Sequence, residues 1–451
     1  MTTIEAALIC ALKKCTSKNG VIGLKVADLL EKHRLGGGRE IELAKKLERL
    51  GKRAARDKKY TLAQQFFDGA AKWFKRGNDK EKTAEMVSVA AETFVKEAKA
   101  RLSSADPSNM VAARFFEQAI LKLRQIPKAQ RPALKVDQRI AKLHTKMTIA
   151  NVKSLEEMEL ISSGPIDISE IVKDSVSRVE GKTAVEAFTE FANIDPGANK
   201  NELRKHSEQM LREGIVASLF GATHMSRDGR VIGKRPPIDR DTIPDATLWA
   251  EMVKEYGVRV DLVVKGCIWP ALGVLQLEHR LSEDDFVALA ESSLAVPPGR
   301  AKFFGKALFA GYDNDFVSSL HLLVPQIENL VRFHLKNIGA KTTNIDMNGI
   351  ENENGLSTLA DLPEMENIFG EDLSFEIKAI FCSSSGPNLR NEVAHGLVEW
   401  DNCFSPYSVY AWWLGFRIIF NTYLSFKRRY EAAKKSDKQE GEEVQGPASD
   451  Q

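Results

Sequence analysis

Gly386-Pro-Asn-Leu-Arg-Asn-Glu-Val-Ala-His-Gly396 has the pattern of a short helix with a defined start. Pro387 cannot continue a helix from upstream, and Asn388 is a good N-cap whose side chain can accept a backbone N–H. Arg390 then falls in the first turn and His395 in the second, about 140° apart around the helix axis. Arginine in a first turn opposes the helix dipole unless an anion lies nearby. The stretch therefore predicts a phosphate or carboxylate partner.

The residues around this stretch predict a helical domain over 305–432. Residues 315–339 have the pattern of a long amphipathic helix, in which Pro325 should cause a kink or a break. Asn348-Gly349 predicts a tight turn of the β-hairpin type. The aromatic-rich stretch 405–435 predicts a buried helix.

The first region, 1–160, is predicted to be helical almost throughout. Residues 62–78 and 109–127 both place Ala and Phe at three- and four-residue spacing, with a helix breaker afterwards. This pattern is typical of packed helical hairpins, similar to tetratricopeptide units, although the spacing of the two copies makes the repeat a loose one. Two interpretations remain open: a scaffold that binds a peptide or RNA along a basic face, or an ordinary helical bundle with solvated lysines.

The middle region, 161–304, is again mainly helical, with one predicted hairpin at 222–237. Asp228-Gly229 supplies the turn of this hairpin. Its basic or titratable side chains are His224, Arg227, Arg230 and Lys234. They suit a phosphate backbone, or they are simply an exposed charged ribbon. The chain is thus predicted to be all-α with two small β-hairpins, and the apolar-poor end, 433–451, to be disordered.

Charge is distributed unevenly along the chain. The whole sequence has a net charge of +2, with 64 Lys and Arg against 62 Asp and Glu. Residues 1–150 hold 32 basic and 16 acidic side chains, so this region carries +16 and the remainder −14. Such a division predicts either an anionic ligand or protein partner for the first region, or docking of one part of the chain on the other.

Composition and missing motifs limit the compartment, membrane association and cofactors to be expected. The five cysteines are odd in number, scattered and without a C-x-x-C pair, which indicates reduced thiols, a cytoplasmic protein and no zinc site. The most apolar stretch, 407–424, is interrupted by Arg417 and Asn421, so a core helix is expected and no membrane span. The usual phosphate-loop, dinucleotide, zinc-protease and serine-hydrolase motifs are missing, and no metal or other cofactor is expected.

Arg390-Asn391-Glu-Val-Ala-His395-Gly396 resembles the signature of the HEPN (higher eukaryotes and prokaryotes nucleotide-binding) superfamily. More narrowly, residues 321–420 are similar to a domain of unknown function named for the string R-N-x-x-x-H-G. The flanking sequence also resembles that domain, in the segments PQIENLVRFHL, LADLPEM and GEDLSFEIKAIF. The resemblance covers about a quarter of the chain and implies a metal-independent ribonuclease that works as a homodimer.

The resemblance assigns chemical roles to three residues of the motif. His395 would exchange a proton with the ribose 2′-hydroxyl or the leaving oxygen, because imidazole titrates near neutrality in general. Arg390 would bind the phosphate and offset the charge of the transition state. Asn391, on the same helix face as His395, would orient the ring or bond the phosphate.

Three supporting residues complete the expected site. Glu328, on the preceding long helix, would pair with Arg390 and hold it in place. Asn388 would leave the helix N-terminus open to an anion. Gly396 would allow another backbone to approach closely, as a dimer cleft requires.

The sequence thus predicts an endoribonuclease that cleaves RNA through the 2′-hydroxyl, acting in bacterial defence or stress. The alternative is a non-catalytic protein that binds nucleic acid or a nucleotide, or a scaffold, and uses the same domain for dimerisation. RNA is the expected partner in the first case, and salt-sensitive RNA binding without cleavage distinguishes the second.

Overall fold

The computed structural model describes residues 3–16, 19–159, 164–214, 219, 221–226, 228–239 and 242–443. Within them the fold is all-α with two small antiparallel hairpins, which confirms the predicted class. The chain divides into two compact units. Unit 1 comprises Met1–Ser163 with Met225–Val231, and unit 2 comprises Gly164–His224 with Ile232–Gln451.

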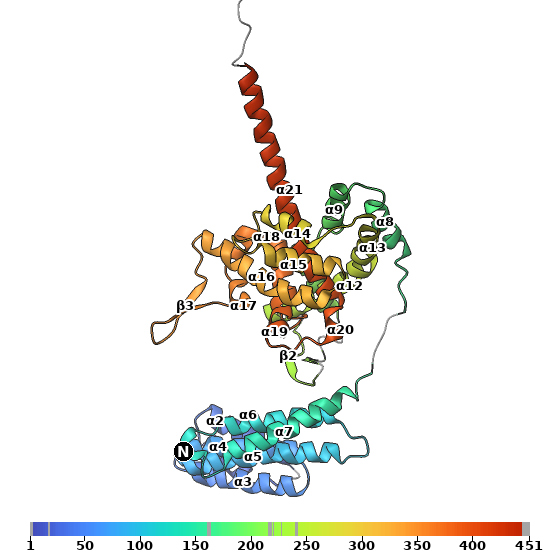
Figure 1. Cartoon of the computed structure of the whole chain (residues 1–451). Helices are drawn as coiled ribbons and strands as arrows, with labels where there is room; N and C mark the ends of the chain where they lie inside the picture. Colours follow the sequence, from blue (N-terminus) through green and yellow to red (C-terminus); the bar gives the residue numbers. More distant parts are fainter. Residues whose placement is uncertain are drawn as a thin grey trace, which may run out of the picture. The chain divides into compact units, whose positions relative to one another are not determined.

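Unit 1 is a run of antiparallel helices in which each helix from α3 onward packs on the next (Figure 1). Its helices are α1 (Thr3–Lys14), α2 (Gly20–Lys32), α3 (Glu40–Arg56), α4 (Tyr60–Arg76), α5 (Lys80–Leu102), α6 (Asn109–Arg124), the 3₁₀ turn η1 (Lys128–Gln130) and α7 (Val136–Leu155). The Ala and Phe side chains that set the period, such as Ala63, Phe66 and Ala70 in α4, are fully buried. The predicted stacking of helical hairpins follows from this buried stripe.

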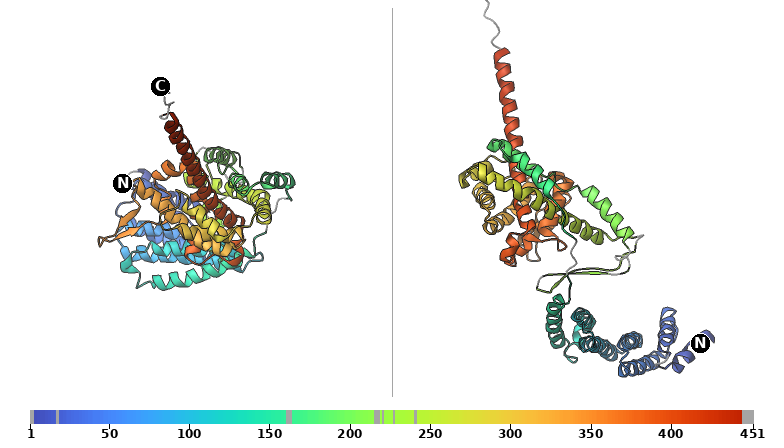
Figure 2. Two further views of the ribbon diagram at one scale, coloured as in Figure 1. Left: turned by 45° about the horizontal axis from the view of Figure 1, so that its top comes forward. Right: turned by 90° about the vertical axis from the view of Figure 1, so that its right-hand side faces the viewer.

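The remaining elements belong to unit 2, except that the tip of the β1–β2 hairpin, Met225–Val231, belongs to unit 1 (Figures 1 and 2). They are α8 (Ser169–Val179), α9 (Ala184–Ala192), α10 (Lys200–Glu213), β1 (Ala222–Met225), β2 (Val231–Arg235), α12 (Asp245–Val263), η2 (Val264–Ile268), α13 (Trp269–Glu278), α14 (Glu283–Glu291), α15 (Ala301–Tyr312), α16 (Phe316–Asn337), β3 (Thr343–Ile345), β4 (Glu351–Glu353), α17 (Leu356–Leu359), α18 (Glu364–Ile377), η3 (Lys378–Cys382), α19 (Leu389–Ala394), α20 (Trp400–Cys403) and α21 (Pro406–Glu443).

The described residues within 164–224 and 232–432 share one core, where the sequence predicted two domains, 161–304 and 305–432. The reason is α21, whose first half is rich in large apolar side chains that other helices must enclose. It packs against α9, α12 and α14 from the middle region and against α15 and α16. Trp413 Nε1 donates to the carbonyl of Phe191 at 2.9 Å, and Trp412 Nε1 to that of Leu308 at 3.0 Å.

Two local features differ from the sequence prediction. Helix α16 continues through Pro325 as one element. Residues 433–443, predicted to be disordered, continue α21 to Glu443, because Ala, Lys, Gln and Glu extend a helix that is already nucleated upstream. Figure 2 shows this second half of α21 running out beyond the core of unit 2. Residues 444–451 lie outside the described part of the chain.

One helical stretch in the described residues, Asp245–Glu278, is long and apolar enough to cross a membrane by composition. The sequence analysis had instead placed the most apolar stretch in α21. Side chains of the Asp245–Glu278 stretch, among them Tyr256, Val260 and Leu272, belong to the shared core of unit 2. Packing between helices accounts for these buried side chains, while others in the stretch, such as Val258 and Leu277, are exposed.

Candidate functional site

The motif helix α19 begins after Asn388, as predicted, but Asn388 does not cap it with its side chain. Its backbone has the left-handed φ of 50°, and its carbonyl accepts from the N–H groups of Asn391 at 3.0 Å and Glu392 at 3.1 Å. The Oδ1 atom of Asn388 accepts from Nδ2 of Asn391 at 3.0 Å. Asn388 therefore fixes the amide of Asn391, and at six residues α19 is too short to provide the predicted anion site at its N-terminus.

The end of α19 explains Gly396. His395 is the C-cap, Gly396 has a φ of 64°, and the N–H groups of Gly396 and Leu397 donate to the carbonyls of Val393 and Glu392. This is the Schellman arrangement, which favours glycine at the left-handed position. A Cβ on Gly396 would meet no atom within 4 Å, so backbone conformation alone requires glycine in this chain. Its predicted role in a dimer cleft stays a prediction.

Gly396→Ala is expected to destabilise unit 2 by about 1 kcal/mol, because a left-handed conformation is unfavourable for a residue with a Cβ. Gly396→Asn should be milder, since asparagine adopts this conformation more readily. Urea unfolding of the two variants measures the difference. Equal stability of both variants and the wild type would contradict the structural role.

The arginine of the motif is held by an ion-pair network on α16. Arg390 Nε donates to Oε2 of Glu328 at 2.7 Å, which is the predicted pair. The other oxygen, Oε1, accepts from Arg332 Nη2 at 2.6 Å. Arg332 in turn donates to the carbonyl of Asn354 at 2.7 Å and pairs with Glu353 of β4 at 3.1 Å. Glu328 thus joins the motif to the base of the β3–β4 hairpin.

Glu328 is ionised in this setting. Burial alone would raise the pKa of its carboxyl, but the hydrogen bonds from Arg390 and Arg332 outweigh burial and hold the pKa below the ordinary value of 4.5. A lowered folded-state pKa stabilises the protein above the ordinary pKa, and this contribution is lost as the pH falls through the folded value.

Glu328→Gln is therefore expected to reduce stability at pH 7 by about 2 kcal/mol, because hydrogen bonds to a charged acceptor are lost. The variant should also lose less stability than the wild type when the pH falls below 4.5. Urea unfolding at pH 7 and pH 3.5 measures both effects. Exposed Glu291, substituted in the same way, is the control. An unchanged acid dependence in Glu328→Gln would contradict this assignment.

Asn391 is fully engaged with its neighbours in the motif. Its Oδ1 accepts from Arg390 Nη1 at 3.1 Å, and its Nδ2 donates to Asn388. The side chain therefore orients Arg390, whereas the sequence predicted that it would orient His395 or bond a phosphate. The Nη2 atom of Arg390 makes no hydrogen bond to the described part of the chain, so this edge of the guanidinium can bind an anion.

His395 lies apart from this network. Its side chain is exposed, and only its backbone N–H is bonded, to the carbonyl of Asn391 at 3.0 Å. Among the described residues the imidazole has no hydrogen-bond partner. The structure thus gathers Arg390, Asn391, Asn388 and Glu328, and leaves His395 free on the surface at the end of the same short helix.

The surroundings of Arg390 include residues that the sequence analysis missed. A Cβ on Gly355 would lie 3.1 Å from Nη2 of Arg390, so the glycine leaves room beside the guanidinium. Burial raises the pKa of the Cys382 thiol to about 11, so this neighbour is not a thiolate nucleophile at neutral pH. Arg332 was detectable, because it lies four residues after Glu328 on one helix face.

The β1–β2 hairpin is less basic than predicted. Arg230 Nε pairs with Oδ2 of Asp228 at 2.7 Å, which offsets its charge. Lys234 is exposed on β2 and His224 is partly buried on β1, while Arg227 lies outside the described residues. The contact of this hairpin with a phosphate backbone stays a prediction.

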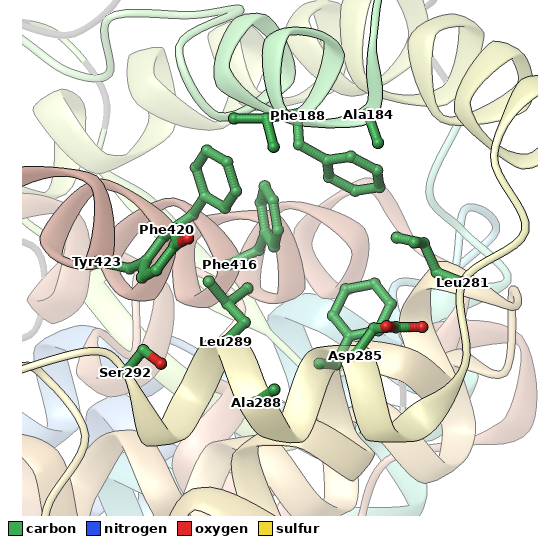
Figure 3. A pocket seen from close by; sticks show the side chains of 12 residues that line it. Ala184, Phe188, Leu281, Asp285, Ala288, Leu289, Ser292, Phe416, Phe420 and Tyr423 are labelled. Atoms are coloured by element: carbon green, nitrogen blue, oxygen red, sulfur yellow. The ribbon is translucent and has the colours of Figure 1, made fainter. Parts of the chain in front are cut away.

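An apolar hollow of about 350 Å³ lies elsewhere in unit 2 (Figure 3). Phe188, Phe416, Phe420 and Tyr423 line it. Its one carboxylate, Asp285, is bonded to the backbone and hydroxyl of Ser282 as part of a helix cap. The hollow offers no acid–base pair. Within the described residues no three His, Cys, Asp or Glu side chains are grouped to hold a metal ion.

Comparisons with protein-family models, curated proteins and solved structures give no match to this chain. The function is therefore inferred from the chemistry of the motif and its surroundings.

Proposed function

We propose that unit 2 is a metal-independent endoribonuclease of the HEPN type, with Arg390 and His395 as its catalytic residues. The observation that carries this proposal is the hydrogen bonding of the Arg390 guanidinium. Glu328 and Asn391 hold Nε and Nη1 in place, while Nη2 remains available for a phosphate. His395, exposed and with no side-chain hydrogen bond to the described residues, caps the C-terminal end of the same short helix. A fixed cation and an exposed base on the same motif suit phosphodiester cleavage once a substrate or a second copy brings the two to one phosphate.

The proposed reaction is attack by the ribose 2′-oxygen on the adjacent phosphorus. His395 accepts the proton of the 2′-hydroxyl, a bond forms between the 2′-oxygen and phosphorus, and the bond from phosphorus to the 5′-oxygen breaks. The 5′-oxygen leaves with a proton from water or from a second imidazole. Arg390 offsets the negative charge on the phosphoryl oxygens. The products are a 2′,3′-cyclic phosphate and a 5′-hydroxyl.

A second copy of the chain is proposed to complete the site. In one copy, no hydrogen bond joins His395 to the network of Arg390 among the described residues. Two motif helices brought together would supply two imidazoles, one to accept the first proton and one to donate the second. Cytoplasmic action in bacterial defence or stress is proposed from the resemblance alone.

The alternative is a protein that binds RNA or a nucleotide without cutting it. The observation that favours this alternative is the engagement of Asn391 with Arg390 and Asn388, which leaves the ring of His395 without an orienting partner. A site with a bound phosphate and a freely rotating imidazole would retain RNA but cleave it poorly.

The reaction class is tested with a fluorescent RNA, the same RNA with a single 2′-deoxyribose, and DNA of the same sequence, all in EDTA. Cleavage of the RNA is expected at ribose positions only, with the deoxyribose position protected, because the nucleophile is absent there. Equal cutting of DNA, or cleavage only when a divalent cation is added, would contradict the proposal.

A further inference from the structure

The outward face of α3 carries a continuous row of cations. At 100° per residue, the side chains of positions 45, 49, 52, 53 and 56 fall within about 100° of the helix circumference. These residues, defined here as the α3 basic face, are Lys45, Arg49, Lys52, Arg53 and Arg56, and all are exposed. The row extends over about 16 Å, given a rise of about 1.5 Å per residue.

Most of these cations have no carboxylate partner within the described chain. Lys52 pairs with Glu48 at 2.5 Å, whereas Arg49 donates Nε only to the backbone carbonyl of Lys45. Lys45, Arg53 and Arg56 make no ion pair to the described residues. The one carboxylate of α3 on this face, Glu42, is paired with Lys13 from α1 at 2.5 Å.

Some cations on other helices of unit 1 are paired, whereas others, such as Lys142 and Lys146 of α7, are exposed and make no ion pair to the described residues. Lys72 pairs with Glu31, Lys122 with Asp68, Arg101 with Glu97 and Arg139 with Glu92. The feature that distinguishes α3 is the run of Lys45, Arg49 and Arg53, which follow one another at four-residue spacing on one exposed face. Like charges at this spacing destabilise a helix. An external anion bound to this row would offset the repulsion between the like charges.

The form of the face indicates the kind of anion. A row of about 16 Å is too long for one phosphate group and suits a chain of phosphates. Helix α3 has no exposed large apolar side chain, whereas the core of a protein–protein interface is usually apolar. The row also lacks an exposed aromatic ring on which a base would stack.

We propose that the α3 basic face binds the phosphate backbone of RNA without regard to base sequence. The choice of RNA over other polyanions rests on the proposed function of unit 2. The face holds the substrate through unit 1, independently of the chemistry at Arg390 and His395.

The test uses the full chain carrying His395→Ala, in EDTA, so that the RNA stays intact. Binding of a fluorescent 20-nucleotide RNA of mixed sequence is measured by anisotropy from 50 to 300 mM KCl. The test variant adds K45Q, R49Q and R53Q. The control adds K142Q, K146Q and K153Q, which removes the same charge from exposed positions of α7. Circular dichroism and thermal unfolding confirm the fold of each variant.

The α3 variant is expected to bind at least about tenfold more weakly than the His395→Ala parent, with a salt slope smaller by about 2, because three phosphate contacts are lost. The α7 control should change affinity less than about threefold. Equal losses in the two variants, or unchanged binding by the α3 variant, would overturn the proposal. Competition by polyglutamate as strong as that by RNA at equal charge would also overturn it, by indicating an acidic protein partner.

The outcome is independent of the ribonuclease proposal. Selective loss of binding in the α3 variant supports the α3 basic face even when wild-type protein leaves RNA uncut. Cleavage by wild-type protein together with unchanged binding by the α3 variant contradicts the α3 basic face and leaves the ribonuclease proposal in place.

Discussion

Replacing His395 with alanine is expected to lower the rate of RNA cleavage by at least about 100-fold, since a positioned general base or acid contributes about 10²–10⁴ to a rate. The imidazole is exposed and bonds to none of the described residues, so its removal leaves the packing of unit 2 intact. Stability should therefore change by less than about 0.5 kcal/mol. Loss of activity without loss of stability is the signature of a chemical role.

His321→Ala provides the matched control, because His321 is also exposed in unit 2 and its ring bonds only a carbonyl of its own helix, that of Val317. Single-turnover cleavage of a fluorescent RNA and urea unfolding are measured for both variants. His321→Ala should retain wild-type activity. A His395→Ala protein that cleaves at the wild-type rate would remove His395 from the mechanism.

Replacing Glu376 with alanine is expected to have the largest effect on stability, about 3–5 kcal/mol, because it leaves a buried charge network without its centre. Glu376 is 1% exposed. Its Oε1 accepts from the hydroxyls of Tyr256 at 2.9 Å and Tyr410 at 2.7 Å and from the N–H of Ala198 at 2.9 Å. Arg417 lies 3.5 Å from Oε2. Burial raises the pKa of this carboxyl, while Arg417 and the hydrogen bonds act against that rise.

This network joins segments far apart in the sequence, from the loop before α10 to α21. In Glu376→Ala, urea unfolding followed by tryptophan fluorescence is expected to show lower stability for the whole of unit 2. The reason is that the middle and C-terminal regions share one core. Glu371→Ala, an exposed position on the same helix α18, should change stability by less than about 1 kcal/mol. A similarly small loss of stability in Glu376→Ala would contradict the role of this carboxylate in holding the core of unit 2 together.

Local structure was largely predictable from the sequence. The Ala and Phe period placed α4 and α6 within a few residues, and Asn348-Gly349 forms the turn between β3 and β4, with a φ of 80° at Gly349. The pair between Glu328 and Arg390 followed from the family resemblance, and it is present. These features were predictable because each depends on residues close together in the sequence or on the motif 390–396 and its flanks.

The arrangement of distant segments was not predictable in the same way. The bond from Trp413 to Phe191, which joins the C-terminal helix to the middle region, leaves no periodic signal in either stretch. The conformation of Asn388 was also missed, because an N-cap asparagine and a left-handed asparagine look alike in sequence. Glycine after the last helical residue is also a C-cap signal, so Gly396 was readable from the sequence as the end of α19.

Incubation of RNA in EDTA with the wild-type chain and with His395→Ala in parallel tests the ribonuclease proposal most directly. The fragments are separated on a gel, and their ends are identified by treatment with acid and phosphatase. The wild-type chain is expected to produce fragments with 2′,3′-cyclic phosphate ends, and His395→Ala to leave the RNA intact. Intact RNA in both reactions, or the same fragments in both, would contradict the proposal that Arg390 and His395 form a ribonuclease site.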